Sequence, residues 1–477
     1  MVEFNCSSLS RYQPPSNALS PEQEAALKTL QEQFSISDEA TAKIVDGLNN
    51  AMDHGLQGTG EGLLMEPSYV TGRSTGQEQG SYLALDFGGS NLRVCLVNLQ
   101  GKHIVSMEQG KHKFSDSIKK DKGVVLFGQI AEFINTFLTE QRQIGNLPKN
   151  QETALNLGFT FSFPMRQQHL ASGVLVRWTK GFENFDVHGK DVVQMLQKEL
   201  DDRGIWVKVN AIVNDTVGTL AASGYTNPSS QIGLILGTGT NAAYYELTEK
   251  ITKLKPQVIN ASKEMIVNME WGAFDDNKKI LPLTEFDNKM DSLTWNPNQQ
   301  IFEKTISGYY LGEIFRLIIK KHIDQGVIFN GKSSKQFDTF EGVDTAFLSQ
   351  ILDDGSSELK AVGEALEKGL GVPQTTLADR IFAKKVTDLI GFRAAKLAGI
   401  GIAVVLLRRK DLLDKPVTVG VDGSLYEFFP FFQAWMNGST RDLLGPDYSK
   451  NVKFTLSKDG SGIGAALASM TATNIKV

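Results

Sequence analysis

The sequence has little cysteine and no segment that indicates a membrane span. Of its 477 residues only Cys6 and Cys95 are cysteines, which indicates neither a disulfide framework nor a metal site. The first residues, MVEFNCSSLSRYQPPSN, lack the apolar core of a signal peptide, and no run of about 18 apolar residues suggests a transmembrane helix. We therefore expect a soluble, cytoplasmic protein without membrane attachment, in which the glycosylation sequons at Asn5, Asn260 and Asn437 are chance matches.

An excess of positive charge is also absent. The chain carries 49 lysines and arginines against 54 aspartates and glutamates, a formal net charge of −5, which argues against a nucleic-acid-binding surface. Its six histidines are scattered without the spacing of metal ligands, so a zinc-based mechanism is not supported. The contents of 41% hydrophobic and 22% charged residues are ordinary for a globular protein, and the length allows two or three domains.

Predicted strands and helices alternate along the chain. After a flexible leader at residues 1–19, the sequence Ser20-Pro21-Glu22-Gln23 combines a capping box with proline at the first helical position, so a helix begins there. Residues 55–80 are expected to form a long connection. Further helices are predicted around 44–52, at 124–142, 190–203, 308–324 and 376–409, from about 427, and at the C-terminus. Strands are predicted at 82–86, 92–99, 154–160, 173–177, 206–213, 231–236, 241–247, 417–421 and 452–456. This order indicates an α/β fold with mixed sheets.

Two strand–turn–strand segments are similar to each other. In the first, Asp86 ends an apolar strand, Gly88 and Gly89 follow, and Arg93 comes shortly after. A glycine turn of this kind can direct its N–H groups at a phosphate, although an ordinary hairpin turn is the alternative. In the second, residues 237–242 read GTGTNA; this matches a dinucleotide-binding fingerprint, but the strand YYEL follows where that fingerprint requires a helix. One such segment in each half of the chain suggests two related domains that face each other across a cleft.

Residues 326–333, GVIFNGKS, match the Walker A pattern. A predicted helix precedes them where the pattern requires a strand, and the polar stretch SKQFDTFEG follows where it requires an apolar helix. We therefore interpret the match as coincidence and expect no phosphate binding there.

Asp215 is a candidate catalytic residue. It follows the predicted strand at 206–213 within the sequence Asn214-Asp215-Thr216, and the carboxyl end of a strand faces the crevice in which α/β proteins bind ligands. Its carboxylate can accept a proton from an attacking hydroxyl. The alternative, at least as common, is that an aspartate or threonine here caps the following helix.

Polar side chains in aromatic surroundings favour a polyol ligand. Lys180 lies between Trp178 and Phe182, Glu270 lies within MEWGAF, and Glu303 follows further along the chain. Each hydroxyl of a sugar both donates and accepts hydrogen bonds, so carboxylates, amides and hydroxyls on loops suit it. The alternative for each of these residues is an ordinary surface or helix-capping position.

Taken together, these segments resemble the hexokinase family, most closely its fungal glucokinase and hexokinase branch. The resemblance covers roughly residues 70–470 and rests on an ordered set of motifs, none of them decisive alone. The motifs are LALDFGGSNLR, LGFTFSFP, RWTKGF, NDTVGTL, GTGTNA, NMEWGAF, FEKTISGYYLGE, GVDGSLYE and KDGSGIGAAL. The stretch SMEQ at 106–109 is typical of the glucokinase-like subgroup.

The resemblance implies a two-domain actin-like ATPase fold, which is ribonuclease H-like, with a deep cleft that closes on sugar. The expected large domain comprises residues 1–68 and 213–460, and the expected small domain comprises 69–212 and 461–477. The implied activity is the ATP-dependent phosphorylation of glucose, or another hexose, at its 6-hydroxyl to give hexose 6-phosphate and ADP, the entry step of glycolysis. A monomer or homodimer is expected.

The resemblance also implies roles for individual residues. Asp215 would be the general base, and Lys180 and Arg93 would offset charge on the transferred group. The implied sugar-binding residues are Ser162, Phe163, Thr179, Lys180, Asn214, Asp215, Asn241, Glu270 and Glu303. The implied nucleotide-binding residues are Asp86, Gly88, Gly89, Ser90, Asn91, Lys111, Gly237, Thr238, Gly239, Thr240, Gly420, Asp422, Gly423, Ser424 and Leu425. Mg²⁺ is expected on the ATP phosphates, held through water near Asp86 and Asp215.

Two departures from the family pattern leave the chemical groups in place. Ser90 stands where threonine is usual, and Phe87 stands where leucine is common. The alternatives are a catalytically weak sugar sensor of the same fold and an actin-like ATPase. A sensor would be free to lose the base or a glycine turn, and an ATPase would lack the sugar-facing set, yet the sequence contains both.

Overall fold

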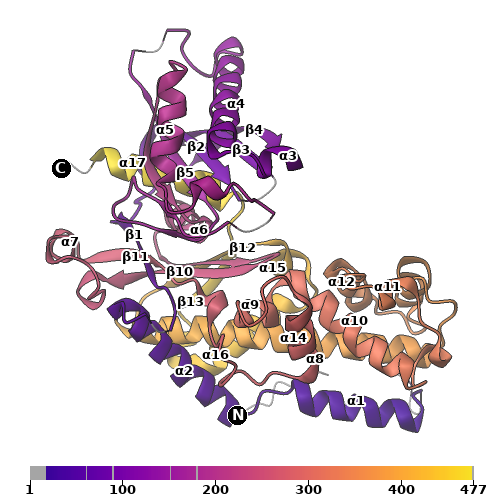
Figure 1. Cartoon of the computed structure of the whole chain (residues 1–477). Helices are drawn as coiled ribbons and strands as arrows, with labels where there is room; N and C mark the ends of the chain where they lie inside the picture. Colours follow the sequence, from indigo (N-terminus) through magenta and orange to yellow (C-terminus); the bar gives the residue numbers. More distant parts are fainter. Residues whose placement is uncertain are drawn as a thin grey trace.

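Two mixed β-sheets with helices on their faces make up the computed structural model (Figure 1). The structure describes residue 15 and residues 18–60, 62–88, 91–150, 152–178 and 181–474. The five-stranded sheet has the order β4 (Val105–Lys113), β3 (Asn91–Gln100), β2 (Gln79–Phe87), β5 (Leu155–Phe161) and β8 (Val207–Val213). The six-stranded sheet has the order β1 (Glu66–Thr71), β11 (Glu264–Asn268), β10 (Thr240–Leu247), β9 (Ser230–Leu236), β12 (Val417–Asp422) and β13 (Val452–Leu456).

The two sheets share one pairing pattern. From β4 to β8 the neighbouring pairs are antiparallel, antiparallel, parallel and parallel, and from β11 to β13 they repeat this sequence. A helix follows the last strand of each: α6 (Asp215–Thr226) and α17 (Gly460–Asn474). The two similar segments of the sequence are thus the hairpins β2–β3 and β9–β10, which occupy corresponding places in the two sheets.

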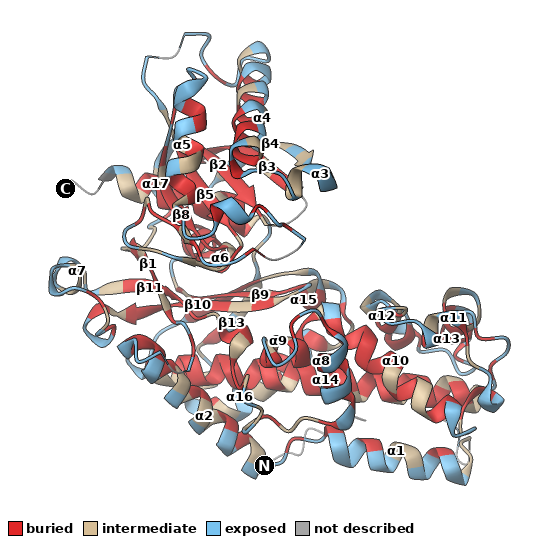
Figure 2. Cartoon of the chain, in the orientation of Figure 1, coloured by how far each residue is buried: buried red, intermediate tan, exposed pale blue. Residues whose placement is uncertain are grey.

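Alternation along the strands determines how the layers pack. In β2, Leu83, Leu85 and Phe87 pack against α4 (Gly123–Gln143) and α5 (Val192–Asp202), whereas Ala84 points to the opposite face, toward α6 and α17. This is the two-residue period of a strand that is buried on both faces. The helices α6 and α17 also contact Tyr245 of the six-stranded sheet, so they form a buried layer between the sheets (Figure 2).

Glycines allow the closest approaches in this middle layer. A Cβ on Gly158 of β5 would lie 1.8 Å from the Ala465 carbonyl oxygen, and a Cβ on Gly464 would lie 2.0 Å from that of Gly218. No side chain can occupy either gap. The motif KDGSGIGAAL is therefore a packing motif as well as part of the candidate site.

A long helix covers the other face of the six-stranded sheet. α14 (Leu377–Arg408) is apolar and long enough to cross a membrane by length and composition, and 83% of an 18-residue window within it is buried inside the structure. The expectation that no such run exists is therefore wrong on composition, because a helix buried on all sides needs the same apolar surface. Other helices around it are α1 (Pro21–Phe34), α2 (Asp38–Gln57), α8 (Glu285–Leu293), α9 (Ile301–Ile306), α10 (Gly308–Asp324), α12 (Thr345–Asp353) and α16 (Phe432–Ser449).

Most predicted elements are confirmed, but four strands were missed: β1, β4, β11 and the short β6 (Met165–Arg166). α1 begins with the predicted capping box between Ser20 and Gln23, and the predicted strands at 82–86, 92–99 and 206–213 are β2, β3 and β8. The connection expected at 55–80 is wrong in part, because it contains β1; β4 and β11 were also not predicted. β4 is an edge strand of mostly polar sequence, which has no strong strand pattern. The strand predicted at 173–177 is reduced to β7 (Val174–Leu175).

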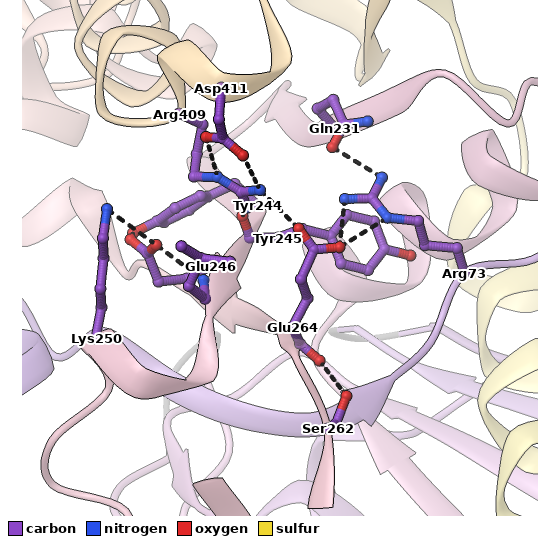
Figure 3. A network of polar contacts seen from close by, with 11 residues as sticks. Arg73, Gln231, Tyr244, Tyr245, Glu246, Lys250, Ser262, Glu264, Arg409 and Asp411 are labelled. Atoms are coloured by element: carbon purple, nitrogen blue, oxygen red, sulfur yellow. Dashed lines mark hydrogen bonds and ion pairs between the residues drawn. The ribbon is translucent and has the colours of Figure 1, made fainter. Parts of the chain in front are cut away.

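The chain crosses between the two sheets after β1, and Arg73 anchors this crossing (Figure 3). Its guanidinium donates to Glu264 Oε2 at 2.9 and 2.8 Å and to Gln231 Oε1 at 2.8 Å. It also lies 4.1 Å from the centroid of the Tyr245 ring. The other oxygen of Glu264 accepts from Arg409 at 2.6 Å. One carboxylate of the six-stranded sheet therefore fixes the start of the crossing.

We predict that Glu264→Gln lowers the free energy of unfolding by about 2 kcal/mol, because two largely buried guanidinium groups lose their shared charged acceptor. Chemical denaturation followed by circular dichroism measures this. Glu249→Gln, on the exposed turn after β10, is the matched control and should leave the midpoint unchanged.

The pH dependence provides a second check. Burial alone raises the pKa of Glu264, but the bonds from Arg409 and Arg73 hold it below the ordinary value of 4.5. A carboxyl with a lowered pKa in the folded state contributes stability above the unfolded pKa and loses it as the pH falls through the folded pKa. The difference between parent and Glu264→Gln should therefore disappear on acidification; a constant difference down to pH 3 would contradict the assignment.

Candidate active site

Asp215 lies at the first turn of α6, at the carboxyl end of β8. The preceding residue, Asn214, caps this helix: its side-chain oxygen accepts from the backbone N–H of Thr216 at 2.9 Å. The capping role considered for the aspartate is therefore performed by its neighbour. The Asp215 carboxylate accepts from the Thr216 hydroxyl at 3.3 Å, and it remains available at the helix N-terminus, where negative charge is favoured.

A chain of amide side chains joins Asn214 to Glu270. Asn241 Nδ2 donates to Asn214 Oδ1 at 3.4 Å and to Asn268 Oδ1 at 2.7 Å, and Asn268 Nδ2 donates to Glu270 Oε1 at 2.7 Å. The structure thus brings together three predicted residues, each at the end of a different strand. Asn268, which links them, was missed by the sequence analysis although it belongs to the motif NMEWGAF.

Burial raises the pKa of the Glu270 carboxyl, and the negative charge of Asp215 raises it further, against the bond from Asn268. Glu270 also has a φ of 53°, a left-handed conformation that a residue with a side chain adopts at a cost of about 1–2 kcal/mol. This combination of backbone strain and a perturbed carboxyl is typical of functional sites.

Glu303 connects the sugar-facing set to the second glycine turn. It lies in α9, and its Oε2 accepts from the backbone N–H of Thr240 at 2.9 Å. A Cβ on Gly239 would lie 2.6 Å from the same oxygen, so a side chain there would displace the Glu303 carboxylate from its bond to Thr240. Trp271 Nε1 donates to the Thr240 hydroxyl at 3.0 Å, which fixes the turn from its other side.

The first glycine turn lies against the C-terminal helix. Asp86 Oδ2 accepts from Arg93 Nε and Nη2 at 3.0 and 2.6 Å and from the Ser461 hydroxyl at 2.8 Å. Arg93 Nη1 also donates to Asp459 at 2.9 Å. Burial alone lowers the pKa of Arg93, but its carboxylate partners raise it overall. Arg93 is therefore a fixed cation that holds Asp86.

Ser162, Gly88 and Phe163 are further predicted residues beside the first glycine turn and the five-stranded sheet. Ser162 follows β5, its N–H donates to the Phe87 carbonyl at 3.1 Å, and its hydroxyl lies 3.5 Å from where a Cβ on Gly88 would be. Phe163 is buried in an aromatic cluster, with its ring centroid 5.2 Å from that of Phe87 and 4.9 Å from that of Trp178. Gly89, Ser90, Thr179 and Lys180 lie outside the described residues, as does the side chain of Asn91.

A cavity of about 520 Å³ opens beside the second glycine turn. It is lined by residues 237–238, 308–309, 313, 341, 343–346, 349, 424–425 and 428–429. Four of the predicted nucleotide-binding residues, Gly237, Thr238, Ser424 and Leu425, are among these. The lining from α10, α12 and the loop before α12 was missed, because those segments carry no recognisable phosphate or base motif.

Three further predicted nucleotide-binding residues, Asp422, Gly420 and Lys111, are not part of the cavity lining. Burial, together with the charges of Asp215 and Asp459, raises the pKa of Asp422 to about 6. Gly420 does not line the cavity: a Cβ on it would lie 2.4 Å from the Ser223 hydroxyl of α6, so it serves strand–helix packing. Lys111 is exposed on β4, opposite Arg93 in the strand register.

The Walker A match does not belong to this site. It lies beyond the C-terminal end of α10 as a turn and a short 3₁₀ segment (Phe329–Gly331), and the N–H of Phe329 donates to Asp379. It contributes no residue to the cavity lining.

The metal expected from the resemblance can be compared with the side chains that are present. Within the described ranges no group of three or more His, Cys, Asp or Glu side chains could hold a metal ion. Asp86, Asp215 and Asp422 are instead separate carboxylates, and Asp215 lies close enough to affect the pKa of Asp422. These residues fit a Mg²⁺ ion that is carried by phosphate oxygens and reached through water, as is usual for this ion.

Comparison with known proteins agrees with this geometry. Two family models, both described as hexokinase, match residues 26–225 and 231–471. The hexokinase of Kluyveromyces lactis is 36% identical over 95% of this chain and 92% of its own length, and the glucokinase of Aspergillus niger is 38% identical over 88% and 92%. A solved structure of Schistosoma mansoni hexokinase with glucose superposes with a TM-score of 0.81 at 37% identity, covering 94% of this chain and 99% of that one.

We predict that Gly423→Ala destabilises the protein by about 2–4 kcal/mol, since φ is +127° there and a Cβ would lie 2.2 Å from the Leu236 carbonyl oxygen. Thermal or denaturant unfolding measures the loss. Gly189→Ala, at φ +73° with nothing within 4 Å, isolates the backbone term and should cost only about 1 kcal/mol. Equal losses in the two variants would show that the contact between the turn at Gly423 and the turn after Leu236 is not tight.

Proposed function

The chain belongs to the hexokinase family, and on this premise we propose which of its residues phosphorylate glucose with ATP at the 6-hydroxyl. The fold is the two-domain α/β architecture of actin-like ATPases. The observation that carries the assignment is the bonded path from Asn214, beside Asp215, through Asn241 and Asn268 to Glu270. It joins a candidate base to a set of sugar-binding groups beside a phosphate-facing turn.

The sugar-binding groups in this proposal are carboxylates and amides at strand ends and in α9. Asn214, Asn241, Glu270 and Glu303 provide acceptors and donors, and Ser162, after β5, adds a hydroxyl. Thr179 and Lys180, which lie outside the described residues, complete the proposed set. Each sugar hydroxyl can donate to a carboxylate and accept from an amide. Phe163 supports this set through packing, because its ring lies in the aromatic cluster.

Asp215 is the proposed general base. Phosphoryl transfer passes through a loose transition state and depends mainly on positioning and electrostatic stabilisation. The sugar oxygen becomes acidic as its bond to phosphorus forms, so a carboxylate at the helix N-terminus accepts the proton late. Lys180 offsets charge on the transferred group, while Arg93 acts by holding Asp86 in place.

ATP is proposed to occupy the cavity beside Gly237 and Thr238. Its phosphates would lie between the two glycine turns, where backbone N–H groups stabilise their charge. Asp86 and Asp215, with Asp422 nearby, would hold Mg²⁺ through water, and the ion would neutralise charge on the phosphates. Ser424 and Leu425 would contact the adenosine end.

Water competes with the sugar for the phosphoryl group, and domain closure is the proposed answer. The proposed domains, 1–68 with 213–460 and 69–212 with 461–477, meet at the Arg73 crossing and at the layer of α6 and α17. Closure on the sugar would assemble the site only when the correct acceptor is bound. We further propose a cytoplasmic monomer or homodimer that acts at the entry to glycolysis.

We predict that Asp215→Ala folds and binds glucose but loses nearly all turnover, because no other proposed group can accept the hydroxyl proton. Formation of glucose 6-phosphate in a coupled assay gives kcat, and calorimetry gives glucose affinity. Asp202→Ala, on the exposed end of α5, is the control. A rate within about tenfold of the parent, equal to about 1.4 kcal/mol of barrier, would reject Asp215 as the base.

The same assay distinguishes the alternatives. A kinase consumes ATP in proportion to glucose 6-phosphate formed, an actin-like ATPase consumes it without glucose, and a sensor binds glucose with little consumption of ATP. Glucose, mannose and fructose compared by kcat/KM define the acceptor range.

A further inference from the structure

The wall of the nucleotide cavity begins beside the phosphate turn, Gly237 and Thr238. Tyr309, in α10, starts there, since its N–H donates to the Thr238 carbonyl at 3.1 Å, and its side chain leads along the wall to Glu341 in the loop before α12. A nucleotide whose phosphates lie at the turn must therefore direct its base toward the remaining lining. This step rests on the proposed function.

Tyr309 and Glu341 form a fixed pair on that wall. The Tyr309 hydroxyl donates to Glu341 Oε1 at 2.7 Å, and burial, with this bond and charge, raises the pKa of Tyr309 to about 12. The hydroxyl therefore stays protonated. Tyr309 is 47% exposed, and we expect its ring to stack against a base.

A buried ion pair positions Glu341 from behind. Its N–H donates to Glu313 Oε2 at 3.0 Å, and both Glu313 oxygens accept from Arg316 at 2.7 and 2.6 Å. Arg316 also donates to the Phe337 carbonyl. Glu341 itself has a φ of 58°, so this support maintains a strained backbone at the cavity wall.

The charged side chains that line the cavity are all hydrogen-bond acceptors. Glu313, Glu341 and Asp344 all contribute carboxylates, whereas the lining contains no lysine, arginine, asparagine or glutamine. Glu313 is committed to Arg316, and Asp344 Oδ1 caps α12 through the N–H of Ala346. Glu341 Oε2 accepts from no other group in the part of the chain that the structure describes.

We propose that Glu341, oriented by Tyr309, determines which purine the enzyme accepts. Its free carboxylate oxygen accepts a hydrogen bond from the 6-amino group of adenine and repels the 6-oxo group of hypoxanthine or guanine. A site built around such an acceptor discriminates against an analogue that presents another acceptor there. Glu341 is thus a specificity-determining residue for the phosphoryl donor.

The test compares ATP, ITP and GTP as donors at saturating glucose, with glucose 6-phosphate measured directly. The parent should prefer ATP to ITP. Glu341→Gln, whose amide can also donate to a 6-oxo group, should reduce the ATP:ITP ratio of kcat/KM by about tenfold, mostly through the nucleotide KM. Tyr309→Phe keeps the ring but releases Glu341 and should reduce the ratio less, in the same direction. Glu364→Gln, exposed on α13 (Lys360–Glu364), should leave it unchanged.

Three results would overturn the inference: a parent without preference for ATP over ITP, an unchanged ratio in folded Glu341→Gln, or a larger loss with GTP than with ATP. The last result would mean that the carboxylate accepts from the N1–H and 2-amino groups of guanine. A parent that forms no glucose 6-phosphate from ATP would instead contradict the proposed function, so the two failures are distinguishable.

Discussion

The site depends on the side-chain oxygen of Asn214. This one atom caps α6 and also accepts from Asn241 of the neighbouring sheet. Because the cap is satisfied by an uncharged amide, the adjacent Asp215 does not need to fold back onto the helix end. The bond from Asn241 to Asn214 ties this helix end to the amides and carboxylates of the six-stranded sheet. A free carboxylate and a satisfied helix end are thus obtained from two consecutive residues.

Residues far apart in the sequence complete each other across the middle layer. Arg93 bonds Asp459 across 366 residues, and Ser461 bonds Asp86 across 375. Because α17 packs between the two sheets beside α6, the end of the chain carries part of the first glycine turn's support. The repeated sheet topology explains this: a helix follows the last strand of each sheet, and the two helices, α6 and α17, pack against each other.

The sequence predicts best where one local pattern determines the outcome. The capping box at Ser20 and the hairpin after Asp86 are such cases, and both are present. β4 was not predicted because an edge strand needs no apolar alternation, and the role of Asn268 was missed because an amide between two others has no signal of its own. Gly420 shows the opposite problem: it belongs to a family motif, but its contact with Ser223 gives it a packing role. Cavity walls assembled from separate helices are set by tertiary packing, which short motifs do not encode.

The electrostatics of the site explain why it suits a polyol and a phosphate donor together. Asp215 raises the pKa of both Glu270 and Asp422, so these carboxylates repel one another, while Arg93, the cation that lowers the pKa of Asp422, is bonded to Asp86 and Asp459. Hydroxyl groups of a sugar would donate to Glu270 and Glu303, and the metal ion carried by the phosphates would bring positive charge to the Asp86 and Asp422 side. The sugar would therefore reduce the repulsion between Asp215 and Glu270, and the metal ion would reduce the repulsion between Asp215 and Asp422. The carboxylate proposed as the base, Asp215, is also the one that raises the pKa of a group on each side of the site.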